Sequence, residues 1–359
     1  MMSLDQERNA NKLSIDIMGT PTGTSGWTTH TLEFSRAMRE FSTVNLRTHR
    51  VGALKLLFNK DRDMLLNGMF KKKGDFCVVI AGKHHPKELT ARWIVWETTK
   101  LPDSQRKLCD SAQYLWVPSH WGRENLMANG YAPERIFVVP EGVATDFYTP
   151  SRVLPKKNKF RFLMVGKWEE RKFTEALVRA FCKEFKSTEA VELYLQAHNK
   201  LLPNFSLSKK IAELNIANTE HIICGAPCSK FELRDLYRSA DCFVLPTRAE
   251  GWGLPILESM ACGIPAIVTR YSAPMDYVTE NNGYLLNVAK MVPAQDSDFG
   301  INTGLWAEPD VEHLCALMRL AFEKQADLRE KGQQAHRDAQ AYSWQKSALT
   351  ATNVIKNLV

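Results

Sequence analysis

The chain has 359 residues, of which 44% are hydrophobic and 24% charged, which is typical of a globular protein of roughly two domains. No segment has the ~20 consecutive apolar residues of a membrane-spanning helix, and residues 1–12 lack the apolar core of a signal peptide. The net charge of +7 is too small to choose among an anionic substrate, a membrane surface and a nucleic acid as the partner.

The eight cysteines favour a cytoplasmic protein with reduced thiols, because they are scattered and include no C-x2-C pair. His221, Cys224 and Cys228 are residue types that bind zinc, but no fourth ligand lies near them in the sequence. We therefore expect no metal site.

The first half of the chain alternates apolar strands with helical patterns. After a strand at 13–18, a turn rich in Gly, Ser and Thr, from Gly19 to Gly26, leads into a helix. Such a turn can bind an anion at the helix start, although many such turns only connect a strand to a helix. Further strands are expected at residues 44–48, 75–81, 93–96, 114–119 and 136–142.

Polar side chains follow several of these strands, where open α/β sheets bind their ligands. They are His84, His85, Glu97, Ser119 and Glu141. A loop histidine without an identified partner is more often structural or exposed, so His84 and His85 are candidates on position alone.

The stretch from Arg50 to Lys73 is basic and amphipathic, with apolar residues near helical spacing. It can lie on an anionic membrane as a peripheral contact. The alternative, which we favour, is a helix packed on its own sheet with a solvated basic face.

Residues 150–159 mix Pro, Ser, Lys and Asn and are predicted to link two domains. The strand–helix alternation then restarts, with strands at 160–165, 191–196, 221–225, 242–245 and 265–269. Two such alternations predict an α/β protein of two facing Rossmann-like domains, with parallel sheets and a cleft between them. We assign residues 1–155, completed by a terminal helix over 343–359, to the first domain and residues 156–342 to the second.

The stretch from Asp241 to Gly263 predicts a strand, a glycine-containing loop and a helix opened by Pro255. Free N–H groups and the helix dipole converge at the start of such a helix and bind anions. Glu250 lies in the loop, and Glu258 lies about one turn into the helix. Carboxylates beside a phosphate-type site suit the recognition of sugar or ribose hydroxyls. The alternative is an ordinary strand–helix unit with one solvated and one capping glutamate.

Basic residues cluster at other expected strand ends of the same domain: Lys167, Arg171, Lys172 and Arg248. Fixed cations and a helix amino-terminus can stabilise a departing diphosphate without a metal ion. No D-x-D pair at a strand end indicates a metal-held diphosphate. Taken alone, Lys167 and Lys172 could equally be solvated loop lysines.

These motifs resemble those of the retaining GT-B glycosyltransferases of family four. The segment 166–172, GKWEERK, is similar to the family's G-[RK]-x4-K element, and the segment 250–258, EGWGLPILE, to its E-x7-E signature, usually EGFGLPxxE. The segments 282–285 and 306–310 resemble later landmarks of the family, and 96–102 with 117–119 resembles one of its branches. The resemblance is dense from about 160 to 310 and thinner before.

The resemblance implies roles at the matching positions. Lys167, where the family usually has Arg, and Lys172 would bind the donor diphosphate, Glu250 the hydroxyls of the donor sugar, and Glu258 the ribose. His84 or His85 follows the strand where relatives place an active-site histidine, but the surrounding sequence does not match. The remaining donor-binding candidates are Gly26, Gly166, Arg171, Arg248, Gly251, Trp252, Gly253 and Leu254.

A retaining transferase of this kind moves a sugar from a nucleoside-diphosphate sugar to a hydroxyl by front-face attack, with no cofactor, metal or protein nucleophile. We expect a glycan or lipid acceptor, with nucleic acid left open; the donor and the oligomeric state are not specified. The competing hypotheses are a nucleotide-sugar epimerase, a sugar phosphorylase, and a non-catalytic nucleotide- or nucleic-acid-binding protein.

Overall fold

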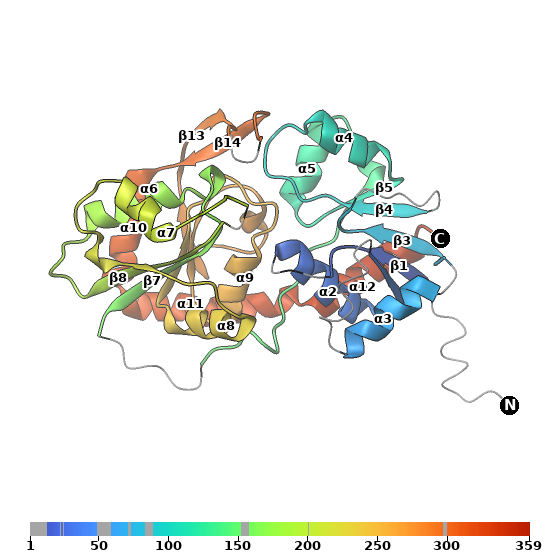
Figure 1. Ribbon diagram of the computed structural model, residues 1–359, viewed down its shortest axis with the longest axis horizontal. Helices are drawn as coiled ribbons and strands as arrows, with labels where there is room; N and C mark the ends of the chain where they lie inside the picture. The colour runs from blue at the N-terminus through green and yellow to red at the C-terminus, as the bar shows by residue number, and fades with distance from the viewer. Residues whose placement is uncertain are drawn as a thin grey trace. The chain divides into compact units, whose positions relative to one another are not determined.

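The computed structural model describes residues 13–21, 23, 25–48, 59–70, 73–82, 89–151, 158–199, 201–296 and 300–359. The chain divides into two compact units, each built on one sheet (Figure 1). The first comprises residues 1–95, 101–142 and 342–359, and the second comprises 96–100 and 143–341. Both sheets have six strands that are all parallel, which confirms the predicted α/β class with two Rossmann-like halves.

The sheet of the first unit has the order β2-β1-β3-β4-β5-β6. Its strands are β1 (Ser14–Met18), β2 (Thr43–Arg47), β3 (Phe76–Val79), β4 (Thr90–Trp93), β5 (Tyr114–Val117) and β6 (Ile136–Val138). Its helices are α2 (Gly26–Met38), α3 (Asn59–Phe70), α4 (Asp103–Asp110), α5 (His120–Ala128) and α12 (Trp344–Lys356). Helix α12 comes from the end of the chain and packs against α2 of the same unit.

The sheet of the second unit has the order β12-β11-β10-β7-β8-β9. Its strands are β7 (Phe160–Gly166), β8 (Val191–Ala197), β9 (Ile222–Cys224), β10 (Cys242–Leu245), β11 (Ala266–Thr269) and β12 (Gly283–Leu286). Its helices are α6 (Thr174–Glu184), α7 (Leu207–Glu213), α8 (Lys230–Ser239), α9 (Leu254–Ala261), α10 (Val311–Glu323) and α11 (Gln325–Ala339). A separate antiparallel hairpin is formed by β13 (Val288–Pro293) and β14 (Leu305–Pro309).

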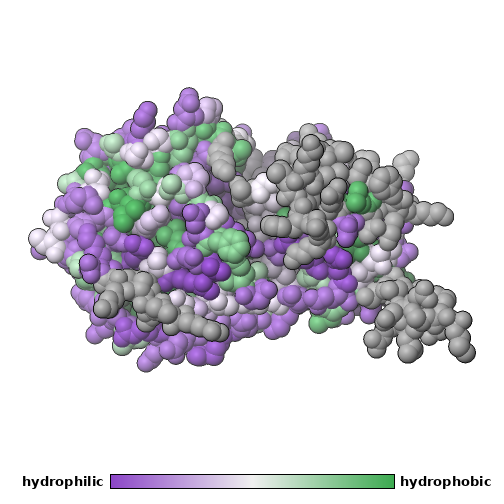
Figure 2. All heavy atoms as spheres, turned by 60° about the horizontal axis from the view of Figure 1, so that its bottom comes forward, coloured by the Kyte–Doolittle hydropathy of each residue, from purple (hydrophilic) through white to green (hydrophobic). Residues whose placement is uncertain are grey.

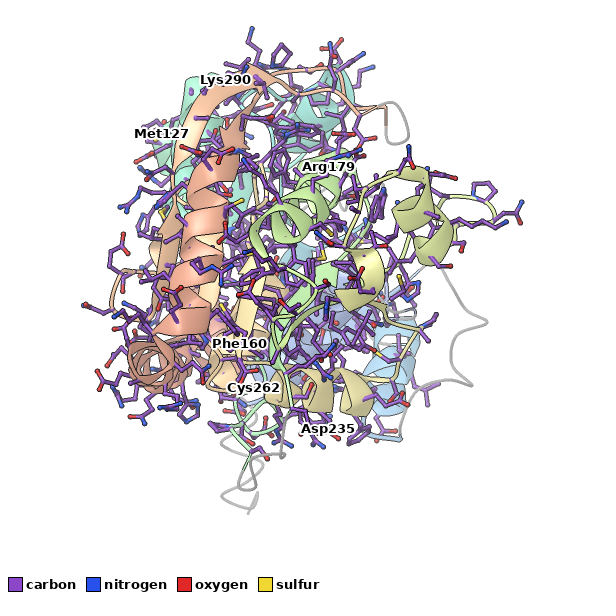
Figure 3. The ribbon with its side chains drawn as sticks, turned by 90° about the vertical axis from the view of Figure 1, so that its left-hand side faces the viewer. Met127, Phe160, Arg179, Asp235, Cys262 and Lys290 are labelled. Atoms are coloured by element: carbon purple, nitrogen blue, oxygen red, sulfur yellow. The ribbon has the colours of Figure 1, made fainter. Side chains whose placement is uncertain are left out.

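Apolar strands and amphipathic helices bury the core of the second unit. Strand β10 is buried at every position, and α6 turns Leu177 and Phe181 inward. Helices α6 and α10 lie on one side of the sheet, and α8, α9 and α11 lie on the other (Figure 1). Figure 3 shows Phe160 at the start of β7 and Cys262 at the end of α9 among these layers.

Two boundaries differ from the sequence-based assignment. The chain enters the second unit at Val143, before the predicted linker at 150–159, and Arg238 of α8 donates to the carbonyl of Thr149 within this unit. The strand expected at 93–96 is β4, which ends at Trp93. Trp96 continues the apolar run but belongs to a segment of the second unit. Part of the predicted linker, 152–157, lies outside the described residues.

The described part of the basic stretch is the helix α3, which packs against β2. Met64 and Leu65 are buried, and Asp61 forms an ion pair with Arg36 of α2. Arg47 of β2 also donates to the carbonyl of Gly68. These contacts fit the favoured interpretation of a helix on its own sheet, and membrane contact stays a prediction.

Hydrophilic and hydrophobic residues are interspersed over the face shown in Figure 2. Within the described ranges, none of the helices combines the length and the apolar character that crossing a bilayer requires.

Candidate active site

The loop after β10 and the start of α9 form one rigid structure. Gly253 caps α9 with a φ of 95°, a conformation that favours glycine. A Cβ atom there would lie 2.8 Å from the hydroxyl of Tyr277, which donates to the carbonyl of Trp252 over 2.6 Å. Pro255 follows in the first turn, where its missing N–H leaves no bond unmade. The amino-terminus of α9 is therefore held in place by its own loop.

Glu250 lies in this loop and is only 4% exposed. Its Oε1 accepts a hydrogen bond from Lys172 Nζ over 2.5 Å and lies 3.2 Å from Arg171 Nη1. Burial alone would raise the pKa of Glu250, but the charges of Lys172 and Arg171 outweigh it and lower the pKa. The carboxyl group is therefore ionised at neutral pH and can accept hydrogen bonds from hydroxyl groups.

Arg171 connects several elements of the second unit. Its Nη1 donates to the carbonyl of Ala249 over 2.6 Å, and its Nη2 lies 2.7 Å from Glu169 Oε1 and 3.6 Å from Glu97 Oε1. Burial alone would lower the pKa of Arg171, but the surrounding carboxylates raise it. Arg171 therefore remains charged and is shared among acidic side chains.

Arg248 is placed beside this cluster and not inside it. Its guanidinium pairs with Glu170 over 2.8 Å and with Glu308 over 2.7 Å, and it lies 4.9 Å from the ring centre of Phe173. In this arrangement Arg248 fastens the loop to β14. Among the interactions of the described residues, none joins Arg248 to Glu250. The role of Arg248 in donor binding therefore stays a prediction.

Glu258 is buried in α9, and its Oε2 accepts a hydrogen bond from the hydroxyl of Tyr237 in α8 over 2.8 Å. Burial raises the pKa of Glu258 to about 7, although hydrogen bonds from Tyr237 and Tyr148 act in the opposite direction. Glu258 therefore has a different environment from Glu250, because it has tyrosine partners where Glu250 has cationic ones.

Two other predicted residues lie at the end of β7. A Cβ atom on Gly166 would lie 3.7 Å from Lys172 Cδ, so the lysine side chain passes directly over this glycine. Lys167 is exposed next to it. Gly251 is buried, and Leu254 is the half-buried first residue of α9.

The ring of Trp252 is 2% exposed and lies 5.1 Å from that of Tyr277. It is part of the core, so any contact of this residue with a donor would use its main chain. The role of Trp252 in donor binding stays a prediction.

The remaining candidates lie elsewhere. Gly26 begins α2 in the first unit, and His84 and His85 lie outside the described residues. Ser119 caps α5 by accepting from the N–H of Gly122, and Glu141 pairs with buried His30 over 3.1 Å, so both have structural partners.

Sequence reasoning missed several residues that hold the site. Tyr237 and Tyr277 had no signal, because their roles arise from contacts between distant parts of the chain. Glu169 lies within the basic segment 166–172, where its position does not indicate that it pairs with Arg171. Ser272 accepts from the N–H of Glu250 over 2.8 Å and also had no local signal.

The described residues contain no group of three side chains arranged to bind a metal ion. His221, considered as a zinc ligand, lies 2.8 Å from the carbonyl oxygen of Ser187 and 3.0 Å from Lys159 Nζ, so both ring nitrogens have protein partners.

Residues 149–337, more than half of the chain, match the model of the family described as glycosyl transferases group 1. The chain belongs to this family, and the resemblance seen in the motifs is confirmed.

Two curated relatives of this chain are a mannosyltransferase and an inositol phosphate glycosyltransferase. The chain is 26% identical over 296 residues to an MMP alpha-(1->4)-mannosyltransferase of Mycolicibacterium hassiacum, covering 78% of this chain and 66% of that protein. It is 24% identical over 265 residues to a D-inositol 3-phosphate glycosyltransferase of Arthrobacter sp., covering 70% and 57% respectively. The chain therefore spans less than two thirds of the length of these curated relatives.

Solved structures show the same fold over nearly the whole chain. A glycosyltransferase from Rickettsia africae has a TM-score of 0.73 at 16% identity and covers 97% of this chain and 99% of its own. HepE from Anabaena, solved in complex with UDP-glucose, has a TM-score of 0.69 at 14% identity and covers 96% and 100%. These likenesses confirm the GT-B fold.

Proposed function

We propose that the protein is a retaining glycosyltransferase that moves a sugar from a nucleoside-diphosphate sugar to a hydroxyl group. The observation that carries this proposal is the contact between Lys172 Nζ and Glu250 Oε1, beside the amino-terminus of α9. A cation and an ionised carboxylate then lie beside the start of a helix, where the helix dipole is positive. These are the groups that a diphosphate and a sugar require.

Each group has a separate task in the proposed reaction. Lys172 has three donor hydrogens, so it can bind a diphosphate oxygen while it keeps its hydrogen bond to Glu250. Glu250 accepts hydrogen bonds from hydroxyls of the donor sugar. Glu258 accepts them from the ribose.

In the transfer step, the bond between the sugar C1 and the diphosphate oxygen breaks, and its electron pair leaves with the nucleoside diphosphate. The acceptor oxygen bonds to C1 on the same face, and its proton passes to the departing phosphate oxygen. The charge that develops there is stabilised by Lys172 and by the N–H groups of α9. We propose that no metal or cofactor takes part.

The donor is proposed to be a nucleotide sugar because the site groups suit one, and because HepE, a structural neighbour, was solved with UDP-glucose. The acceptor is proposed to be a hydroxyl of a glycan or lipid. The base and the sugar are to be found with a panel of UDP-, GDP- and ADP-sugars, since a true donor stabilises the folded protein by mass action.

The deciding experiment measures release of nucleoside diphosphate from the stabilising donor, with EDTA present. We expect slow release in the wild type, and loss of it in Glu250→Gln and Lys172→Met. Glu175→Gln is the matched control, because Glu175 is 51% exposed and pairs only at the surface with Arg179. No release from any donor, or unchanged release in Glu250→Gln, would contradict the proposal. Sugar 1-phosphate formed on addition of inorganic phosphate would identify a phosphorylase instead.

A further inference from the structure

Residues 96–100, which we call the strap, precede most of the second unit in sequence but belong to it. The main chain of the strap is fixed to strand β14. Trp306 Nε1 donates to the carbonyl of Glu97 over 2.8 Å, and the N–H of Thr99 donates to the carbonyl of Leu305 over 3.3 Å. The N–H of Leu305 donates to Thr99 Oγ1 over 2.8 Å. The strap is therefore held by contacts that do not involve the carboxyl group of Glu97.

Gly304, the residue before β14, allows the strap to lie close to the hairpin. Gly304 has a φ of 86°, and a Cβ atom on it would lie 2.6 Å from the backbone nitrogen of Lys100. Real Cβ atoms do not come this close to a backbone atom. Only glycine lets the strap and the hairpin approach in this way.

The side chain of Glu97 extends from the strap to the candidate active site. Its Oε1 lies 3.6 Å from Arg171 Nη2, and Arg171 Nη1 lies 3.2 Å from Glu250 Oε1. Glu169 is the third carboxylate on Arg171, at 2.7 Å. Glu169 and Glu250 already balance the charges of Arg171 and Lys172, and burial raises the pKa of Glu97, so the pairing of charges does not by itself require Glu97.

We propose that Glu97 is a positioning residue, which orients the sugar-binding carboxylate of Glu250 through Arg171. The inference rests on the proposed function and deepens it. Glu250 is held by both Lys172 and Arg171. A bound diphosphate shares the charge of Lys172, which keeps its hydrogen bond to Glu250, so the orientation of Glu250 then depends more on Arg171. Glu97 keeps Arg171 from turning to the diphosphate itself.

The alternative is that Glu97 only helps to fix the strap. Glu97→Gln separates the two roles, because it removes the charge and keeps the main-chain carbonyl that accepts from Trp306. Thr99→Val is the matched control, because it removes the hydroxyl that accepts from the N–H of Leu305 and leaves Glu97 intact. Glu97→Asp restores a carboxylate on a shorter side chain.

The experiment measures kcat, KM for the donor and the melting temperature of the wild type and the three variants, using a nucleotide sugar that the wild type turns over. In Glu97→Gln we expect kcat to fall by about ten- to a hundredfold, as for a reacting group displaced by about 1 Å. KM should stay within about threefold and the melting temperature should not change. Glu97→Asp should recover part of kcat, and Thr99→Val should lower the melting temperature with kcat retained.

A wild-type kcat in Glu97→Gln, or a parallel loss of kcat and melting temperature in Glu97→Gln and Thr99→Val, would overturn the inference alone. A wild type that turns over no nucleotide sugar would overturn the proposed function together with the inference.

Discussion

Tyr237 and Glu258 form a buried hydrogen bond of 2.8 Å between helices α8 and α9, with the phenol as the donor. Because the pKa of Glu258 is raised to about 7, this carboxyl group changes its charge near neutral pH. Both the stability of the second unit and any ligand that uses Glu258 should therefore respond to pH.

The first prediction concerns stability. The pKa of Glu258 rises from its ordinary value of 4.5 to about 7 on folding, so the folded protein binds this proton more tightly than the unfolded chain. Stability contributed by the group is therefore present below pH 4.5 and is lost as the pH rises to about 7. In Glu258→Gln this loss should disappear. The difference in unfolding free energy between the wild type and Glu258→Gln should therefore change by roughly 3 kcal/mol between about pH 5 and pH 8. Urea unfolding at both values measures it.

Tyr237→Phe is the control for this prediction. The hydrogen bond from Tyr237 lowers the pKa of Glu258, so its removal should raise that pKa and move the loss of stability to higher pH. Parallel curves of stability against pH for the wild type and Glu258→Gln would show that the carboxyl group titrates normally.

The second prediction concerns ligand binding, on the proposal that ribose hydroxyls donate to the Glu258 carboxylate. Binding then favours the ionised form, so the affinity for the matching nucleoside diphosphate should increase as the pH rises through about 7. Titration calorimetry at about pH 6 and pH 8 tests this, with Glu258→Gln expected to lack the increase. An affinity with the same pH dependence in both proteins would remove Glu258 from the ribose site.

Much of the fold could be predicted because its signals are local. Helix α8, for example, begins after Ser229, where Ser229 and Glu232 form a capping box that can be recognised in the sequence. The apolar run 242–245 is β10, and the helix opened by Pro255 is α9. By contrast, the apolar run 93–96 does not show that β4 ends at Trp93, because the strap that begins at Trp96 is held by contacts of Glu97 and Thr99 with the distant strand β14.

The site was predictable only as far as its motifs reach. The E-x7-E spacing and the basic segment identified Glu250 and Lys172, and the structure brings their side chains together. The role of Lys167 stays a prediction, and the motifs do not indicate the position of Arg171, whose three carboxylate neighbours come from separate segments. Such convergence depends on the fold, so no spacing in one segment could indicate it.

The third prediction tests the start of α9. In Gly253→Ala, the new Cβ meets the hydroxyl of Tyr277 at 2.8 Å and Ile256 Cδ1 at 2.9 Å. Gly130 is a matched control, because its φ of 93° is close to the 95° of Gly253, and a Cβ atom there would meet nothing within 4 Å. Both alanines bear the strain of a positive φ, which is about 1–3 kcal/mol.

Compared with Gly130→Ala, Gly253→Ala should lower the free energy of unfolding by a further amount of about 1–3 kcal/mol, because the added methyl group overpacks the loop. It should also weaken binding of the nucleoside diphosphate. Chemical denaturation and calorimetry of both variants measure these effects. Equal losses of stability in the two variants would mean that the loop yields to the added methyl group.

The fourth prediction concerns the pair formed by Lys172 and Glu250. Both side chains are buried, so removing one partner leaves a buried charge with fewer partners. Lys172→Met and Glu250→Gln should each lower the unfolding free energy by about 3 kcal/mol, and the double variant by less than their sum. A coupling energy of about 1–3 kcal/mol is expected from the urea unfolding of all four proteins.

The exposed pair Arg179 and Glu175, which has a comparable separation of 2.9 Å, provides the reference cycle. Its coupling energy should be about 0.5 kcal/mol or less, because water screens both charges and holding two long side chains together costs entropy. If the cycle at Lys172 and Glu250 gave a value as small as this, Arg171 would be holding Glu250 without help from the lysine. The double variant should also release no nucleoside diphosphate, since the cation and the carboxylate proposed to contact the donor would both be absent.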